Sequence, residues 1–207
     1  DNLGNTPPDH IRFKEYYIDD LAPAMRKETH VFFRHLLDNN LPTSEFLTAQ
    51  YTFTNPALAR LYHLPVEKSD FPNPDSFIRV STEGHPRGGL LGHSSIHTVT
   101  ANGVDTSPII RGVWLLENIL GTPPSPPPPD IEPIEPDTRG STTIRDQMER
   151  HRSDPTCAEC HRKIDPLGFA LENFDAIGRF RTTYGPKKNI DASGVLPGGQ
   201  EFKDLGQ

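Results

Sequence analysis

Two cysteines and a histidine form the most informative pattern in the chain. They are the only cysteines among the 207 residues and occur in the segment Cys157-Ala158-Glu159-Cys160-His161. On a helix, residues three positions apart share a face, so both thiols can add to the two vinyl groups at one edge of a porphyrin. His161, directly after them, can supply the axial nitrogen beneath the iron. The pattern therefore predicts covalent attachment of haem c.

Three other uses of the same side chains stay open. A redox-active dithiol also uses Cys-x-x-Cys, but it expects a strand before the motif, and the sequence shows none there. Zinc could recruit both thiolates, although His161 would be a strained third ligand beside Cys160 and there is no second cysteine pair. A plain structural disulfide would form in an oxidising compartment. The spacing favours haem over each of them.

The second axial position of the iron decides between two kinds of chemistry. An electron carrier needs a second ligand, whereas an open position permits reaction with peroxide or oxygen. Met148 and His151 precede the motif by a turn or two, and His93 and His97 lie in a glycine-rich stretch of the N-terminal region. For each of these four, an ordinary surface or capping role is the stronger hypothesis, and a site without a second protein ligand is open.

A basic group follows the motif and contains Arg179 and Arg181. The planar fork of an arginine can bind a carboxylate through two hydrogen bonds, so both are candidates for holding a haem propionate. The competing hypothesis is a solvated basic face. An acid/base set made of Asp165, Glu172 and Asp175 is a weaker hypothesis than structural roles, because Asp165 is expected to cap a helix.

Composition excludes two classes of partner. The net charge is −7 without a basic tract, which argues against nucleic acid as a ligand. No apolar run approaches the roughly 18–20 residues that cross a bilayer, so no membrane span is expected. The chain begins at Asp1 without an initiator methionine or an apolar leader, and we expect either a mature protein or a piece of a longer one.

Periodicity and proline start signals predict mostly helices. The first runs over 18–39, with apolar positions such as Leu21, Met25 and Phe32 alternating with charged ones such as Lys27 and Glu28. The other expected elements are a short helix after residue 44, helices at 57–63, 108–120 and 143–151, one from residue 155 that carries the motif, another from residue 166, a strand at 77–81 and a hairpin at 190–202.

Proline divides the chain. Eight of the 14 residues from 123 to 136 are proline, which favours an extended polyproline II spacer. We therefore expect an N-terminal helical region (1–121), a proline-rich spacer (122–137) and a haem c-binding region with a C-terminal tail (138–207). The fold class expected is mainly α with long irregular loops, consisting of a c-type cytochrome-like helical haem module, the spacer and a short C-terminal β-hairpin.

Three blocks of sequence resemble a known family. They are Arg111-Gly112-Val113-Trp114-Leu115-Leu116-Glu117-Asn118 with the proline run after it, the segment 151–161 with the cysteine motif, and Ile164-Asp165-Pro166-Leu167-Gly168-Phe169-Ala170 with its continuation to Asp175. The chain resembles the large secreted c-type cytochrome proteins of planctomycetes, which are built from tandem domains without an assigned function. The resemblance covers most of residues 21–200 and implies an exported haem protein.

The leading functional hypothesis is a module that binds haem c covalently and passes single electrons within a larger exported oxidoreductase assembly. Its partner would be a redox protein or further domains of the same polypeptide, and its location periplasmic, extracellular or at the cell surface, because cytochrome c maturation is completed outside the cytoplasm. The alternatives are a peroxidase-like haem enzyme with an open sixth position, and a structural or interaction segment in which haem stabilises the fold.

Overall fold

The computed structural model describes residues 6–125, 143–151, 155–185 and 188–207, and the side chains of all of these except 149–151 and 155–157. Within these ranges the chain is mainly helical, with three pairs of short antiparallel strands, which confirms the expected mainly α class. The chain forms two compact units. The first comprises residues 1–99 and 177–180, and the second comprises residues 100–176 and 181–205.

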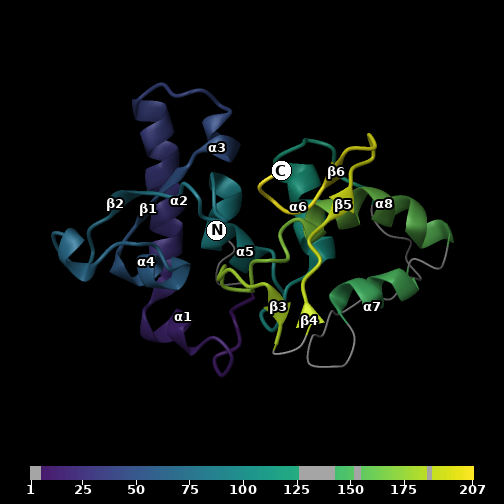
Figure 1. Cartoon of the computed structure of the whole chain (residues 1–207), viewed down its shortest axis with the longest axis horizontal. Coiled ribbons are helices and arrows are strands. Elements are labelled where there is room, and N and C mark those ends of the chain that lie inside the picture. Colours follow the sequence, from purple (N-terminus) through teal and green to yellow (C-terminus); the bar gives the residue numbers. More distant parts are fainter. Residues whose placement is uncertain (1–5, 126–142, 152–154, 186–187) are drawn as a thin grey trace. The chain divides into compact units, whose positions relative to one another are not determined.

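The first unit is built around one long helix, α2 (Figure 1). Its elements are α1 (Lys14–Ile18), α2 (Leu21–Asp38), α3 (Glu45–Thr48), β1 (Tyr51–Thr54), α4 (Pro56–Tyr62), the 3₁₀ turn η1 (Lys68–Asp70), β2 (Ile78–Ser81), the 3₁₀ turn η2 (Leu90–Gly92) and α5 (Ser94–Val99). The strand expected at 77–81 is β2, and it pairs antiparallel with β1, which the sequence analysis did not identify.

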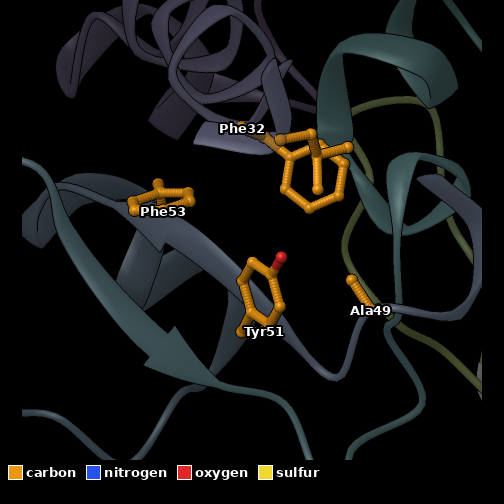
Figure 2. Close-up of a cluster of buried hydrophobic side chains, with 5 residues drawn as sticks. Phe32, Ala49, Tyr51 and Phe53 are labelled. Carbon is orange, nitrogen blue, oxygen red and sulfur yellow. The ribbon is translucent and has the colours of Figure 1, made fainter. Parts of the chain in front are cut away.

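An aromatic core lies between α2 and β1. Figure 2 shows the Phe32 ring of α2 near the Tyr51 ring of β1, with Phe53 and Ala49 on either side. The centroids of the Phe32 and Tyr51 rings are 5.9 Å apart. Aromatic side chains bury a large apolar area each and therefore contribute strongly to the stability of a core. This cluster anchors α2 to the strand pair.

Local signals set the start of α4 as predicted. Asn55 precedes Pro56, the first helical residue, and its Oδ1 accepts a hydrogen bond from the Leu58 amide (3.0 Å). This bond satisfies one of the amides that a helix leaves unpaired at its start, and proline costs nothing at the first position because its missing N–H has no partner there.

In the ranges that the structure describes, the second unit has three helices and two short strand pairs. Its elements are α6 (Pro108–Asn118), α7 (Ile144–His151), α8 (Pro155–Phe169), β3 (Thr183–Tyr184), β4 (Lys188–Asn189), β5 (Gly194–Val195) and β6 (Glu201–Phe202). Pairing of β5 with β6 confirms the hairpin expected in the C-terminal tail.

Two helix starts in this unit follow the sequence signals. Ser107 caps α6, since its Oγ accepts a hydrogen bond from the Ile110 amide (3.3 Å). Thr143 and Asp146 cap α7 reciprocally: the Asp146 amide donates to Thr143 Oγ1 (3.1 Å), and the Thr143 amide donates to Asp146 Oδ2 (2.8 Å). Such a box satisfies two orphan amides at once.

Two glycines let α6 and α8 touch through their backbones (Figure 1). A Cβ on Gly168 would lie 1.8 Å from the Pro108 carbonyl oxygen, and a Cβ on Gly112 would lie 2.1 Å from the Ile164 carbonyl oxygen. Carbon and oxygen atoms do not approach so closely, so only glycine fits at either position. The two contacts fix the position of α8 along α6.

The helix break expected at Asp165-Pro166 is wrong. Instead, α8 continues through Pro166 to Phe169. Proline removes one backbone hydrogen bond there, but the contacts with α6 lie on both sides of it, at Ile164 and at Gly168, and hold the helix together. Asp165 is consequently an interior helical residue and not a cap.

Most of the predicted spacer, from residue 126 onward, lies outside the described residues. The division at the spacer stays a prediction, and α6, which belongs to the predicted N-terminal region, packs on α8 in the second unit. None of the helices in the described ranges is long and apolar enough to span a membrane.

Candidate functional site

The cysteine motif occupies the first half of α8. The helix begins at Pro155, as the Asp154-Pro155 pair predicts, and its backbone is helical at positions 157 and 160. These two backbone positions therefore share a face of the helix. Cys160 is half-buried with a free thiol, and it is the one cysteine whose side chain belongs to the described residues. Haem attachment itself stays a prediction.

The ring of His161 is held by a carboxylate one turn further along α8. Its Nδ1 lies 2.8 Å from Asp165 Oδ1. The Asp165 side chain has no exposed surface, and the His161 side chain is 12% exposed. This contact orients the ring, and because a carboxylate can only accept, pairing with one assigns the proton to Nδ1.

This arrangement fits the ligand role that the motif assigns to His161. Histidines that bind metals in proteins almost always donate their other ring N–H to a carboxylate, a carbonyl or a water. With Nδ1 bonded to Asp165, Nε2 is the nitrogen that would bind iron. The sequence analysis missed Asp165 because it placed a helix break there, whereas the i, i+4 spacing from His161 would have indicated the pair.

A large cleft lies on another side of α8. It has a volume of about 1190 Å³, and its wall includes Arg162, Asp165 and Phe169 together with the β5–β6 hairpin. At 3.6 residues per turn, Cys160 lies roughly 160° around the helix from Arg162. Ala158 and Glu159 of the motif also line the cleft, whereas Cys160 does not. Asp165 is the residue that connects the cleft to His161.

Arg181 belongs to a buried network in the second unit. Its Nη2 donates to Thr106 Oγ1 (3.0 Å) and lies 3.7 Å from Glu172 Oε2. Glu172 also pairs with Arg111, whose Nη1 is 3.2 Å from Glu172 Oε1, and neither side chain has exposed surface. These contacts give Arg181 and Glu172 a structural role. The binding of a propionate by Arg181 stays a prediction.

Arg179 belongs to the first unit and pairs there with Glu15. Its guanidinium also lies 6.0 Å from the centre of the Phe13 ring. The side chain is 37% exposed, so a further carboxylate could still reach it. A propionate role for Arg179 is also a prediction.

The candidates for a second iron ligand lie in different settings. Met148 is fully buried in an apolar cluster with Ile144, Phe169 and Tyr184 in the second unit. His151 is the last residue of α7, and its side chain lies outside the described part of the chain.

The other two candidates, His93 and His97, are buried in the first unit. The His93 Nδ1 is 3.2 Å from Thr29 Oγ1, and its ring packs edge-on against Phe32 with centroids 4.9 Å apart. Burial lowers the pKa of His93 to about 3, so the ring is neutral at physiological pH. A neutral imidazole is the form that binds metals, and ligation by either histidine stays a prediction.

A buried carboxylate lies in the same unit as His93. Glu28 of α2 accepts hydrogen bonds from Thr52 Oγ1 (2.6 Å) and from the Tyr62 hydroxyl (2.5 Å). The guanidinium of Arg87 stacks over the Tyr62 ring at 3.7 Å. Burial raises the pKa of Glu28 to about 7, while the two hydroxyls and the Arg87 charge oppose that rise. The sequence analysis placed Glu28 on the solvent face, although it has no exposed surface.

Glu28 and His93 should make opposite contributions to the pH dependence of stability. The folded-state pKa of Glu28 is raised from 4.5 to about 7, so its contribution is lost as the pH rises through that range. The folded-state pKa of His93 is lowered from 6.5 to about 3, so its contribution is lost as the pH falls. Between pH 4.5 and 6.5 the free energy of unfolding falls with pH because of Glu28 and rises with pH because of His93, and the two changes cancel.

Substitution separates the two slopes. In His93→Gln the free energy of unfolding, measured relative to the unsubstituted chain, should fall by about 3 kcal/mol from pH 4.5 to 6.5, at roughly 1.4 kcal/mol per unit. In Glu28→Gln it should rise over the same interval. Urea titrations followed by circular dichroism at several pH values measure both, and pH-independent differences would contradict the assignment.

Comparison with known families gives a coarse identity. Residues 87–184 match the PSCyt3 family model, described as a protein of unknown function (DUF1588). Residues 1–64 match the PSD4 family model, described as a protein of unknown function (DUF1592). Both are domain families of the planctomycete cytochrome c type. No curated protein and no solved structure gives a significant match to the chain.

The two matches coincide with the features described above. The PSCyt3 match includes α6, α8 and the cysteine motif, and the PSD4 match includes α2 with Glu28. The two matches are consistent with the resemblance inferred from the sequence.

Proposed function

We propose that the chain is a c-type haem-binding module that passes single electrons within a larger exported oxidoreductase assembly. The proposal depends on one observation. His161, the residue directly after Cys160, has its Nδ1 within hydrogen-bond distance of the buried Asp165. A plain disulfide or a redox dithiol gives no reason to orient a neighbouring imidazole with a buried carboxylate, whereas a metal-binding histidine does. The matches to planctomycete cytochrome c-type families support the same proposal.

Each residue of the motif has a defined role in this proposal. The Sγ–H groups of Cys157 and Cys160 add across the two vinyl groups, so each sulfur forms one C–S bond and its hydrogen moves to the neighbouring carbon. His161 binds the iron through Nε2, and Asp165 accepts the Nδ1 proton in a hydrogen bond. The bound haem would supply an iron that exchanges one electron between its ferric and ferrous states.

The remaining sequence predictions complete the proposal. Met148, His151 and His93 are the candidates for the sixth ligand, and Arg179 and Arg181 for propionate binding. Thioether attachment is completed outside the cytoplasm, so the proposed location is the periplasm or the cell surface. The proposed partner is a redox protein or another domain of the same polypeptide.

A second candidate function is a peroxidase-like enzyme with an open sixth position. The observation that favours it is again Asp165, because a carboxylate on the ligand histidine raises its basicity. A more basic axial ligand pushes electron density toward iron and favours cleavage of an O–O bond.

The test is to produce the chain with a cytochrome c maturation system and to compare it with Cys157→Ala/Cys160→Ala. We expect the unsubstituted chain to gain the mass of one haem and to retain it in acidified acetone. The double variant should lose any haem under these conditions, because no thioether remains. A chain whose mass equals the bare polypeptide and that shows no Soret band would overturn both haem proposals.

The reduced spectrum then separates the two functions. A sharp α band that carbon monoxide leaves unchanged supports electron transfer with two protein ligands. A band that shifts on addition of carbon monoxide supports the open site, because the gas binds ferrous iron only where the sixth position is accessible.

A further inference from the structure

Asp165 is a fully buried acidic residue in the interior of a helix. It lies inside α8, immediately before Pro166, and its side chain has no exposed surface. Leaving an ionised carboxylate without water costs several kcal/mol unless strong hydrogen bonds replace the lost hydration. The bond to His161 Nδ1 is one such bond, at 2.8 Å. The fold thus places a buried carboxyl group directly beside one imidazole nitrogen.

The charge acts on whatever His161 binds through its other nitrogen. A carboxylate that accepts the Nδ1 proton gives the ring anionic character and makes Nε2 a stronger donor. Ferric iron carries one more positive charge than ferrous iron, so the stronger donor stabilises the ferric form more. Burial strengthens this effect, because the interaction is weakly screened by water.

Neighbouring charges do not account for the same effect. Of the described cations on the cleft wall, Arg162 and Lys203 are exposed, so water screens their charges. Arg145 donates to the carbonyls of Asp191 and Ser193 at 2.9 and 2.6 Å and stacks on Phe169 at 3.9 Å. Glu159 is exposed, so water screens its charge. Among the described acidic side chains of α8, Asp165 is the one bonded to the histidine ring.

We propose that Asp165 is the positioning residue that sets the reduction potential of this site, by holding His161 and lowering the potential of the iron bound to it. The inference rests on the proposed haem function and deepens it.

The test compares Asp165→Asn with Glu159→Gln in the haem-loaded chain at pH 7, by spectroelectrochemical titration. Both variants remove one negative charge from α8, but only the first removes it from the group bonded to His161. For Asp165→Asn we expect the equilibrium to shift at least tenfold toward the ferrous form, which is 59 mV for one electron. Glu159→Gln should shift it less than twofold. Equal shifts in the two variants would overturn the proposal.

A second measurement keeps the proposal falsifiable if Asp165→Asn does not fold. In the unsubstituted ferric holoprotein, proton NMR should show a hyperfine-shifted His161 Nδ1 proton that exchanges slowly with solvent, because a buried carboxylate holds it. A rapidly exchanging Nδ1 proton would contradict the inference. A chain that carries no haem would instead refute the proposed function, so the two failures are distinguishable.

Discussion

Replacement of Gly168 by Ala should destabilise the second unit by about 3 kcal/mol, at the upper end of the cost of overpacking a core. Helix propensity alone would predict the opposite change in stability, since alanine is a better helix former than glycine by about 1 kcal/mol. The expected loss comes from the crossing of α6 and α8, where the new Cβ would lie 1.8 Å from the Pro108 carbonyl oxygen. Because that atom belongs to the backbone, α8 as a whole must move away.

The measurement is a urea titration followed by the emission of Trp114, the only tryptophan of the chain, which lies on α6. Gly185→Ala is the matched control. Gly185 has a φ of 65° and open space around a Cβ, so the substitution tests backbone strain without a clash and should cost only about 1–2 kcal/mol. A Gly168→Ala variant as stable as the unsubstituted chain would show that the helices do not meet at this glycine.

Local sequence signals predicted helix starts well because capping is a short-range interaction. Asn55, Ser107 and the Thr143/Asp146 pair each bond to amides within three residues, so the residue types and their spacing contain the whole interaction. The C-terminal hairpin was predictable for the same reason, since its turn residues adjoin the paired strands.

The continuation of α8 through Pro166 was not predictable from such signals. It depends on contacts with α6 at Gly112 and Pro108, more than 50 residues away in the sequence. The error had a consequence for the site, because the interpretation of Asp165 as a cap concealed its bond to His161. Recognition of that pair required knowledge that one helix carries both residues.

The burial of charged side chains is a second feature that the sequence pattern did not predict. Glu28 was placed with the solvent-facing residues of its helix because it is charged, although it follows Met25 by three residues on the apolar face. Its burial depends on Thr52 and Tyr62, which supply the hydrogen bonds from other elements. Periodicity alone identifies the face of such a residue, but not the partners that make its burial tolerable.

Each compact unit contains one fully buried glutamate, Glu28 in the first and Glu172 in the second, and the two are satisfied differently. Glu28 is bonded to neutral hydroxyls, and its pKa is raised to about 7. Glu172 faces a fully buried guanidinium, that of Arg111, whose pKa is lowered by burial while the Glu172 charge opposes that shift. We consequently expect the first carboxylate to make stability depend on pH near neutrality, whereas the second forms a buried ion pair with Arg111.

The buried pair of Glu172 and Arg111 leads to the other large expected effect. Glu172→Gln should lower the free energy of unfolding by about 3–5 kcal/mol, because it leaves the buried Arg111 guanidinium without its counter-charge. The amide also disturbs the acceptor that the Thr106 and Tyr184 hydroxyls share, at 2.7 and 2.8 Å from Glu172 Oε2. Arg111 would keep its bonds to the Leu171 and Asp175 carbonyls and the smaller favourable interaction with the Asp175 charge, while an uncharged amide replaces its main counter-charge.

The control is an ion pair of similar geometry that water surrounds. Asp38→Asn removes the partner of Arg34, where the side chains are 56% and 76% exposed, and should cost no more than about 0.5 kcal/mol. Trp114 emission in urea reports the stability of the Glu172 variant, and circular dichroism reports that of both variants.

Arg111→Met should also destabilise the chain strongly. The double variant Arg111→Met/Glu172→Gln should lose less stability than the sum of the two single losses, because each single change leaves the other charge buried without its partner. Additive losses would mean that the two side chains are satisfied independently, which their 3.2 Å contact in the absence of water does not allow.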